Sequence, residues 1–329
     1  PFEIFYIDSL SYFFETIISS THYKSLQNEY VKRLEKPENT RTNKDTDTLN
    51  ILRVNLERWR WNVLFTDTGR VVYVNIPAFE LLVLTGDSML MSSKVCVGIK
   101  RPKTYATLYQ DYLKNPEITP KPRHHETPIL KSAIGYLVLN PQWRVPNSIA
   151  KNEILRNIQK DSNYLSKMGY HVYRGNVQID PHTVDWQSIT PADFPFRLEQ
   201  SAGEQNALGK MKFMFPNKFS VYLHDTPSKK DFSRRDRAVS HGCIRVENYL
   251  ELAHFLLSNK PKYDLAYLRK TIGLDRNATQ QMQTVNLFFK PPIPIIIDYK
   301  TAWIDARGKL NIYTDVYERD LLVLEALRK

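Results

Sequence analysis

Residues 219–248 read FSVYLHDTPSKKDFSRRDRAVSHGCIRVEN and contain Cys243, one of only two cysteines in the 329-residue chain. Cys243 directly follows Gly242, and two histidines lie near it in the sequence, His224 and His241. Three readings are open for such a thiol: a buried structural group, a metal ligand or a nucleophile. The residues around it favour one of the three.

His224 is the better candidate for a base that would activate Cys243. A cysteine attacks as the thiolate, and a thiol is mostly protonated at neutral pH, so a nucleophilic cysteine needs a base or a positive field nearby. The run 218–225 predicts a strand that ends near His224, and the polar loop 226–239 can bring Cys243 back beside the end of that strand. His241 is only two residues from the sulfur and approaches it less easily.

Gly242 and the neighbouring arginines also suit acyl transfer. Glycine permits backbone conformations that are closed to other residues. The amides of Gly242 and Cys243 could therefore point at one oxygen, as an oxyanion hole requires. Positive potential that favours a thiolate and could attract a carboxylate comes from Arg234, Arg235, Arg237 and Arg245.

The other two readings of Cys243 are weaker. A buried inert thiol is the usual role of a lone cysteine, and it fits Cys96, which lies in an apolar strand. Cys243, with glycine, histidine and arginine around it, is less typical of a core position. A zinc site would need further ligands at a recognised spacing, and the sequence contains neither a CxxC nor an HxxxH pair.

The net charge of +11 would attract polyanions in general. Lysine and arginine are spread along the chain without a dense basic block or a recognisable nucleic-acid-binding module, so nucleic acid is not expected as a partner. An anionic cell-wall polymer or a membrane surface fits better. No apolar run is long enough to span a bilayer, and the chain begins at Pro1, so we expect any export signal or membrane anchor to lie upstream.

Hydrophobic periodicity predicts a mixed α+β protein. Residues 1–60 carry apolar residues at helical spacing and predict a short helical N-terminal part. Short β-branched and aromatic runs follow and predict a β-rich region. Within it, residues 101–128 contain five prolines and many charges, which predicts a long surface loop or excursion with one helical turn. Residues 146–168 predict a helical insertion.

The spacing of His224, Ser240-His241-Gly242-Cys243 and Arg245 resembles the signature of L,D-transpeptidases with a YkuD-type catalytic domain. Further segments look like the large periplasmic Gram-negative subgroup, among them VNIPAFELLVL, HETPILKSAIGYLVLNPQWRVPNSIAKNEIL, QNALGKMKFMFPN and VYLHDTP. In that subgroup a helical capping subdomain is inserted into the catalytic β-domain. The resemblance therefore implies a helical N-terminal scaffold segment at residues 1–60 and a β-rich catalytic domain at 61–329, with a capping subdomain at about 141–200.

The resemblance implies peptidoglycan cross-linking through a cysteine thioester. Cys243 would attack a donor stem tetrapeptide at the carbonyl of diaminopimelate, D-Ala would leave, and the side-chain amine of an acceptor diaminopimelate would resolve the thioester. His224 would be the general base, and the amides of Gly242 and Cys243 would hold the oxyanion with help from Tyr222. The substrate-binding residues that the resemblance implies are Tyr222, Ser240, His241, Arg245 and Asn206.

The resemblance also implies partners and a compartment. Stem peptides are the expected substrates, carbapenem-type inhibitors are expected to acylate Cys243, no metal or organic cofactor is expected, and the expected compartment is the periplasm. The motif fixes the acyl-enzyme and not its acceptor. Water would make the protein a carboxypeptidase or amidase, and a protein amine would make it a lipoprotein-attaching enzyme. A non-catalytic wall-binding scaffold is the remaining alternative, and residues 101–124 exceed the connection that the family has at this place.

Overall fold

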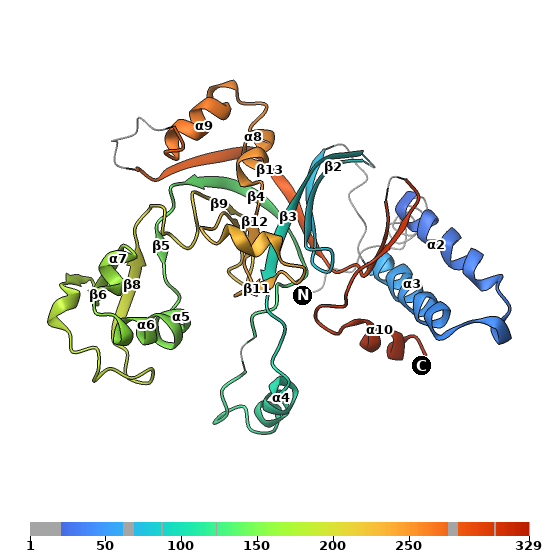
Figure 1. The fold of residues 1–329 in the computed structure, drawn as a ribbon, viewed down its shortest axis with the longest axis horizontal. Helices are drawn as coiled ribbons and strands as arrows, with labels where there is room; N and C mark the ends of the chain where they lie inside the picture. Colours follow the sequence, from blue (N-terminus) through green and yellow to red (C-terminus); the bar gives the residue numbers. More distant parts are fainter. Residues whose placement is uncertain are drawn as a thin grey trace. The chain divides into compact units, whose positions relative to one another are not determined.

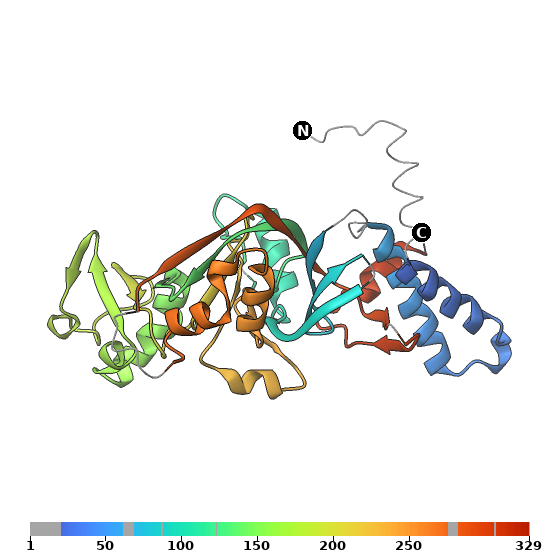
Figure 2. The ribbon, with the colours of Figure 1, turned by 90° about the horizontal axis from the view of Figure 1, so that it is seen from above.

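The computed structural model describes residues 21–61, 69–86, 88–122, 124–275, 282–305 and 307–328 (Figure 1 and Figure 2). Helices and strands both occur along the chain, which confirms the predicted mixed α+β class. The described residues form two compact units. Unit 1 holds the residues up to Ser132, Asp236–Gly242 and the chain from Pro294 onward, and unit 2 holds Ala133–Arg235 and Cys243–Ile293.

Two helices begin the described part of unit 1 and lie side by side in both views: α2 (Thr21–Leu34) and α3 (Asn43–Trp61) (Figure 1 and Figure 2). They bury Leu26, Leu52 and Trp59 against Ala302 and Ile304 near the end of the chain. The predicted helical N-terminal part is therefore helical in α2 and α3. Residues 1–20 lie outside the described residues. A scaffold role for this part stays a prediction. The other small elements here are η1 (Glu38–Thr40), β14 (Ala302–Ile304), β15 (Leu310–Ile312) and α10 (Asp320–Ala326).

The main sheet of unit 1 is built from runs rich in valine, leucine and isoleucine. Strands β1 (Arg70–Asn75), β2 (Glu80–Thr85) and β3 (Ser88–Gly98) follow one another as antiparallel neighbours. β11 (Ala238–Ser240) adds to β3 in parallel, and the second half of β13 (Val285–Asp298) adds to β1 in parallel. Only the first residue of β1 is exposed, as expected of a strand that is covered on both faces.

The excursion after β3 is more regular than the sequence predicts. It contains the ten-residue helix α4 (Tyr105–Lys114), where the sequence predicts a loop with one helical turn. The stretch between Pro102 and Pro116 is free of proline, so a helix of this length can form there without losing a backbone hydrogen bond. Figure 1 shows α4 at the end of two long segments that leave the sheet of its own unit.

The main sheet of unit 2 contains β12 (Ile244–Val246), β10 (Leu223–His224), β9 (Met211–Met214) and β4 (Leu130–Leu139), in that order. β10 runs parallel to β12 and antiparallel to β9, and β9 runs antiparallel to β4. This order places the strand that ends at His224 directly beside the strand that follows Cys243. The remaining elements near this sheet are η4 (Lys229–Ser233), α8 (Tyr249–Leu256), η5 (Pro261–Tyr263) and α9 (Leu265–Thr271).

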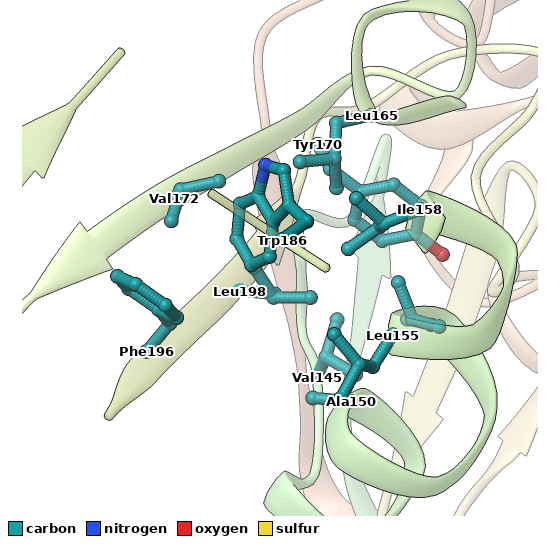
Figure 3. Close-up of a cluster of buried hydrophobic side chains, with 11 residues drawn as sticks. Val145, Ala150, Leu155, Ile158, Leu165, Tyr170, Val172, Trp186, Phe196 and Leu198 are labelled. Atoms are coloured by element: carbon teal, nitrogen blue, oxygen red, sulfur yellow. The ribbon is translucent and has the colours of Figure 1, made fainter. Parts of the chain in front are cut away.

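A second, four-stranded sheet of unit 2 is formed by residues 143–200, in the order β5-β8-β6-β7. Figure 3 shows its core, in which Trp186 lies among aliphatic side chains that include Ile158, Val172 and Leu198. The insertion predicted as helical thus contains both helices and a sheet. The sequence does not predict this sheet, because strands of five residues or fewer have too few alternating apolar and polar positions to give a clear pattern. Its elements are β5 (Trp143–Arg144), α5 (Asn147–Ile149), η2 (Ala150–Ile154), α6 (Leu155–Lys160), α7 (Tyr164–Lys167), β6 (Tyr170–Arg174), β7 (Val177–Ile179), η3 (Pro181–Thr183) and β8 (Phe196–Gln200).

The strand predicted at 218–225 is much shorter in the structure, where β10 comprises only Leu223–His224. Asn217 provides the physical reason. Its side-chain amide donates to two backbone carbonyls and its oxygen accepts from two backbone amides between residues 215 and 221. Ser220 in the same segment has a positive φ of 56°. Side-chain bonds to the local backbone compete with strand pairing, so this segment forms a loop.

Candidate active site

Cross-strand register in unit 2 places His224 and two basic residues on one face of its main sheet. His224 pairs with Lys212 on one side and with Arg245 on the other. Directly paired residues point to the same face, and side chains two residues apart along a strand share a face. Tyr222 directly precedes β10, and Cys243 directly precedes β12, so the ends of two neighbouring strands hold both residues. The hydrogen bond of the Tyr222 side chain to the cysteine agrees with that placement.

His224 is buried, and one of its ring nitrogens already has a partner. Nδ1 lies 2.5 Å from the carbonyl oxygen of Asp225. A carbonyl oxygen can only accept, so Nδ1 carries the proton and Nε2 is the basic nitrogen of the neutral ring. Burial lowers the pKa of His224 to about 3, and the positive charges of Arg245 and Lys212 act in the same direction. The resting ring is neutral at physiological pH, as a general base requires.

Cys243 is half-buried directly before β12. Burial raises the pKa of its thiol, while hydrogen bonds with Tyr222 and the charges of Lys212 and Arg245 act against that rise. Its Sγ lies 3.9 Å from the carbonyl oxygen of Ser220. The resting site therefore holds a protonated thiol and a neutral imidazole, so the sulfur becomes a nucleophile only when its proton is transferred.

The loop that faces the sulfur is organised by Asn217, a residue that the sequence analysis did not single out. Its four hydrogen bonds to the backbone span the segment that includes Ser220, whose carbonyl oxygen lies opposite Sγ. Asparagine after proline is a turn signal, and Pro216-Asn217 before an apolar run could have indicated this loop.

Asp225 is a second residue that the sequence analysis did not use. Its carboxylate accepts the backbone amide of Lys210 at 2.8 Å and pairs with the ammonium of Lys229. Its own amide donates to the carbonyl of Met211 at 2.9 Å. These bonds fix the backbone carbonyl of Asp225, which accepts the hydrogen bond from Nδ1 of His224. Asp225 therefore orients the imidazole ring of the base.

A family model described as the L,D-transpeptidase catalytic domain, YkuD, matches residues 69–267, which is more than half of the chain and contains both His224 and Cys243. The chain belongs to this family of L,D-transpeptidases.

Two further proteins are similar to this L,D-transpeptidase chain. A Haemophilus influenzae protein named "Putative L,D-transpeptidase" is 30% identical over 281 residues, an alignment that covers 85% of this chain and 50% of that protein. The chain thus spans about half the length of this relative. The crystal structure of an L,D-transpeptidase from Xylanimonas cellulosilytica is 11% identical to this chain with a TM-score of 0.25, and the match covers 75% of this chain and 69% of that one.

In this L,D-transpeptidase, Gly242 shapes the backbone that leads to the cysteine. Its φ of 110° is strained for any other residue. Its amide donates to Oγ of Ser240 at 3.1 Å, and its carbonyl accepts from Oγ1 of Thr127 at 2.9 Å. Because the Gly242 amide already has a partner within the protein, its predicted oxyanion role needs that bond to be shared or exchanged. The role stays a prediction.

Ser240 and Asn206 are not presented to a ligand in this conformation. Ser240 is 3% exposed, and its hydroxyl accepts from Gly242. Asn206 is 1% exposed; its side chain donates to the carbonyls of Pro141 and Ser201 and accepts from the amide of Leu208. Burial and these internal bonds leave neither side chain open to a substrate. Both side chains hold loops in this structure, and their predicted contact with a substrate stays a prediction.

The other predicted substrate contacts are placed differently. Tyr222 stands within the site, with its ring 5.6 Å from that of His224. His241 is exposed, and its ring lies 4.8 Å from that of His125. Arg245 donates from Nη1 to Asp231 at 2.8 Å, and this bond fixes the guanidinium group of Arg245, which pairs with His224 across the two strands. Its buried Nε has no hydrogen-bond partner within the described part of the chain. Direct contact of these three with a substrate stays a prediction.

Two kinds of feature are absent from the described ranges. Among these residues, no group of three or more His, Cys, Asp or Glu side chains could hold a metal ion. Nor is any described helix both long and apolar enough to cross a bilayer.

Proposed function

We propose that this L,D-transpeptidase cross-links peptidoglycan by joining diaminopimelate residues of stem peptides through a thioester on Cys243. The observation that carries the proposal is that His224 ends the strand beside the one that Cys243 directly precedes, with Nδ1 of His224 bonded to a carbonyl and Nε2 basic. The family match over residues 69–267 supports the class of reaction.

The first half-reaction forms the thioester. The Cys243 thiol gives its proton to Nε2 of His224 as the sulfur attacks the carbonyl carbon of the donor diaminopimelate. A C–S bond forms, and the tetrahedral intermediate collapses by breaking the C–N bond to D-Ala. The departing nitrogen takes the proton back from the His224 imidazolium, so the leaving group is a neutral amine.

The second half-reaction resolves the thioester. The side-chain amine of an acceptor diaminopimelate attacks the thioester carbonyl and gives a proton to His224. The C–S bond breaks, an amide bond forms, and the departing thiolate recovers the proton from the imidazolium. No oxidant, reductant or cofactor is consumed, and the enzyme returns to its resting protonation state.

The electrostatics of the site suit a proton that moves only when a substrate is bound. Burial lowers the pKa of His224 to about 3, so the ring releases an acquired proton readily. Burial also raises the pKa of Tyr222 well above its ordinary value, so its hydroxyl stays protonated and can donate to a developing negative charge. We propose that the Cys243 amide and the Tyr222 hydroxyl, with the Gly242 amide once it exchanges partners, stabilise the oxyanion.

Incubation with purified muropeptides, followed by mass spectrometry, tests the proposed reaction. We expect release of D-Ala together with dimers joined through two diaminopimelate residues, and the loss of both products in Cys243→Ala. D-Ala release without dimers would contradict cross-linking and identify water as the acceptor. Transfer only to a lipoprotein amine would identify an attaching enzyme, and full activity in Cys243→Ala would point to a non-catalytic role for the thiol.

Acylation by a carbapenem tests the nucleophile independently of the acceptor. Intact-mass measurement should show one covalent adduct on the wild-type protein and none on Cys243→Ala. Cys96 is fully buried and serves as an internal control, so Cys96→Ala should keep the adduct. An adduct that survives Cys243→Ala would contradict the assigned nucleophile.

We propose the periplasm as the working compartment, because the peptidoglycan of Gram-negative cells lies there. Fractionation of cells that express the full-length protein, with detection by antibody, tests this. Recovery together with cytosolic markers would contradict it.

A further inference from the structure

A cavity in unit 2 lies on the same sheet face as His224. Its volume is about 670 Å³, within the range of small-ligand sites. Its floor is formed by Tyr136 and Val138 of β4 and by Lys212 and Met214 of β9. Val138 pairs directly with Lys212, which in turn pairs with His224. One cross-strand row therefore runs from the cavity floor to the general base.

The rim of the cavity is held by Asn140, at the end of β4. Its side-chain amide donates to the carbonyls of Thr271 and Gln283, at 2.7 Å and 3.2 Å. Its own carbonyl accepts from Oγ1 of Thr284 at 2.8 Å. These bonds tie the segment after β4 to the segment before β13, so two rim segments of the cavity are fixed to each other.

Lys212 is a half-buried cation that lines the cavity. Its ammonium lies 4.0 Å from the centre of the Tyr222 ring, and Tyr222 hydrogen-bonds the cysteine. Burial lowers the pKa of Lys212, whereas the nearby Cys243 raises it. A half-buried ammonium loses hydration and is usually compensated by an anion.

No carboxylate of the described residues forms an ion pair with Lys212. Two other lysines of unit 2 differ in this respect: Lys210 pairs with Glu204, and Lys229 pairs with Asp225. The ring of Tyr222 offers only a weak cation–π contact. Lys212 thus combines partial burial, a position on a cavity wall and an unmatched positive charge, which together describe a receptor for an anion.

We propose that this cavity binds the carboxylate-bearing D-amino-acid end of the stem peptide and that the Lys212 ammonium pairs with its carboxylate. This inference rests on the proposed function. It makes Lys212 a specificity-determining residue: the enzyme would select donors that end one residue beyond the bond it cleaves.

The chemistry of the donor places a carboxylate where Lys212 can reach it. In the leaving D-Ala, the carboxylate is attached to the carbon next to the departing nitrogen, about 3–4 Å from the carbonyl carbon that Cys243 attacks. The acceptor presents the same pattern, because the side-chain amine of diaminopimelate sits on a carbon that also bears a carboxylate. One cation can therefore orient the amine that leaves and the amine that attacks.

Lys212 has a competing role that the experiment must separate, which is stabilisation of the Cys243 thiolate. A thiolate stabiliser helps every substrate equally, whereas a carboxylate receptor helps only substrates that carry the carboxylate. The two roles therefore differ in substrate selectivity and not simply in rate.

Two donors separate these roles: a tetrapeptide with a free C-terminal carboxylate and the same peptide with a C-terminal amide. The measurement is kcat/KM for release of D-Ala or of D-alaninamide. We expect the wild-type preference for the acid over the amide to fall about tenfold to a hundredfold in Lys212→Met, the loss expected for one charge-assisted hydrogen bond. Lys212→Arg should keep most of the preference, because it keeps the charge.

Lys262→Met is the matched control. Lys262 is also a lysine of unit 2 over an aromatic ring, that of Tyr263 at 5.7 Å, but it does not line the cavity. Its variant should keep the wild-type preference. If Lys212→Met does not fold by circular dichroism, Lys212→Gln provides the same comparison with a polar side chain.

The outcomes distinguish this inference from the proposed function. An unchanged acid-to-amide preference in Lys212→Met, or an equal loss of rate on both peptides, overturns the carboxylate receptor while leaving the thioester mechanism standing. A wild-type enzyme that releases neither leaving group contradicts the proposed function and the inference together.

Discussion

A buried imidazole that holds a proton poorly makes folding itself sensitive to pH. The pKa of His224 is lowered to about 3 by burial, against an ordinary value of about 6.5. The unfolded chain therefore binds a proton there first as the pH falls. The resulting contribution to stability is complete above about pH 6.5 and is lost as the pH falls toward 3, at up to about 1.4 kcal/mol per pH unit.

Urea unfolding at a series of pH values measures this effect at the residue scale. The free energy of unfolding should fall between about pH 6.5 and pH 4. His224→Gln should flatten that fall, because glutamine has no proton to gain. His241→Gln, at an exposed position, is the control and should keep the wild-type slope. Parallel curves for wild type and His224→Gln would contradict the assignment.

Among elements, the loop 215–221 matters most for the nucleophile, and one side chain holds it. Asn217→Ala removes four hydrogen bonds to the backbone. Because the loop places the Ser220 carbonyl opposite the sulfur, acylation should slow by about tenfold or more, with a loss of stability of about 1–3 kcal/mol. Stopped-flow measurement of D-Ala release, with thermal unfolding alongside, checks both.

Asn163→Ala is the control for the loop prediction. Asn163 precedes α7 without a side-chain capping bond, so its replacement should leave both acylation and stability nearly unchanged. Equal rates for Asn217→Ala and wild type would show that the loop does not position the reacting groups.

The elements also show how far the sequence could lead. His224 and Cys243 were identifiable because they belong to one linear motif. Lys212 and Asp225 were not, since their importance depends on which strand lies beside which. The sequence predicts an eight-residue strand at 218–225, but β10 has only two residues, because the Asn217 side chain forms hydrogen bonds with backbone groups that would otherwise pair with a neighbouring strand. The sheet within residues 143–200 could not be predicted from hydrophobic periodicity, because its strands are short.

At the scale of the whole molecule, the net charge of +11 is the dominant property. A basic protein is drawn to anionic wall polymers by forces that salt screens, and the screening length falls to about 8 Å at physiological ionic strength. Binding of Cys243→Ala to isolated cell walls, measured by sedimentation, should weaken markedly as salt rises. Wall binding that is insensitive to salt would assign the interaction to the stem-peptide site alone.

Parallel pairing of β10 with β12 has a consequence for protein engineering. His224 lies in β10 and Cys243 directly precedes β12, its parallel neighbour, and the chain that leaves Asp225 returns through the loop 226–235 before it reaches β11 and Gly242. Within that return, Ser233–Arg235 are exposed. A fluorophore or an affinity tag grafted there would report on substrate arrival from close by, and the return could be lengthened while the two reactive atoms keep their places.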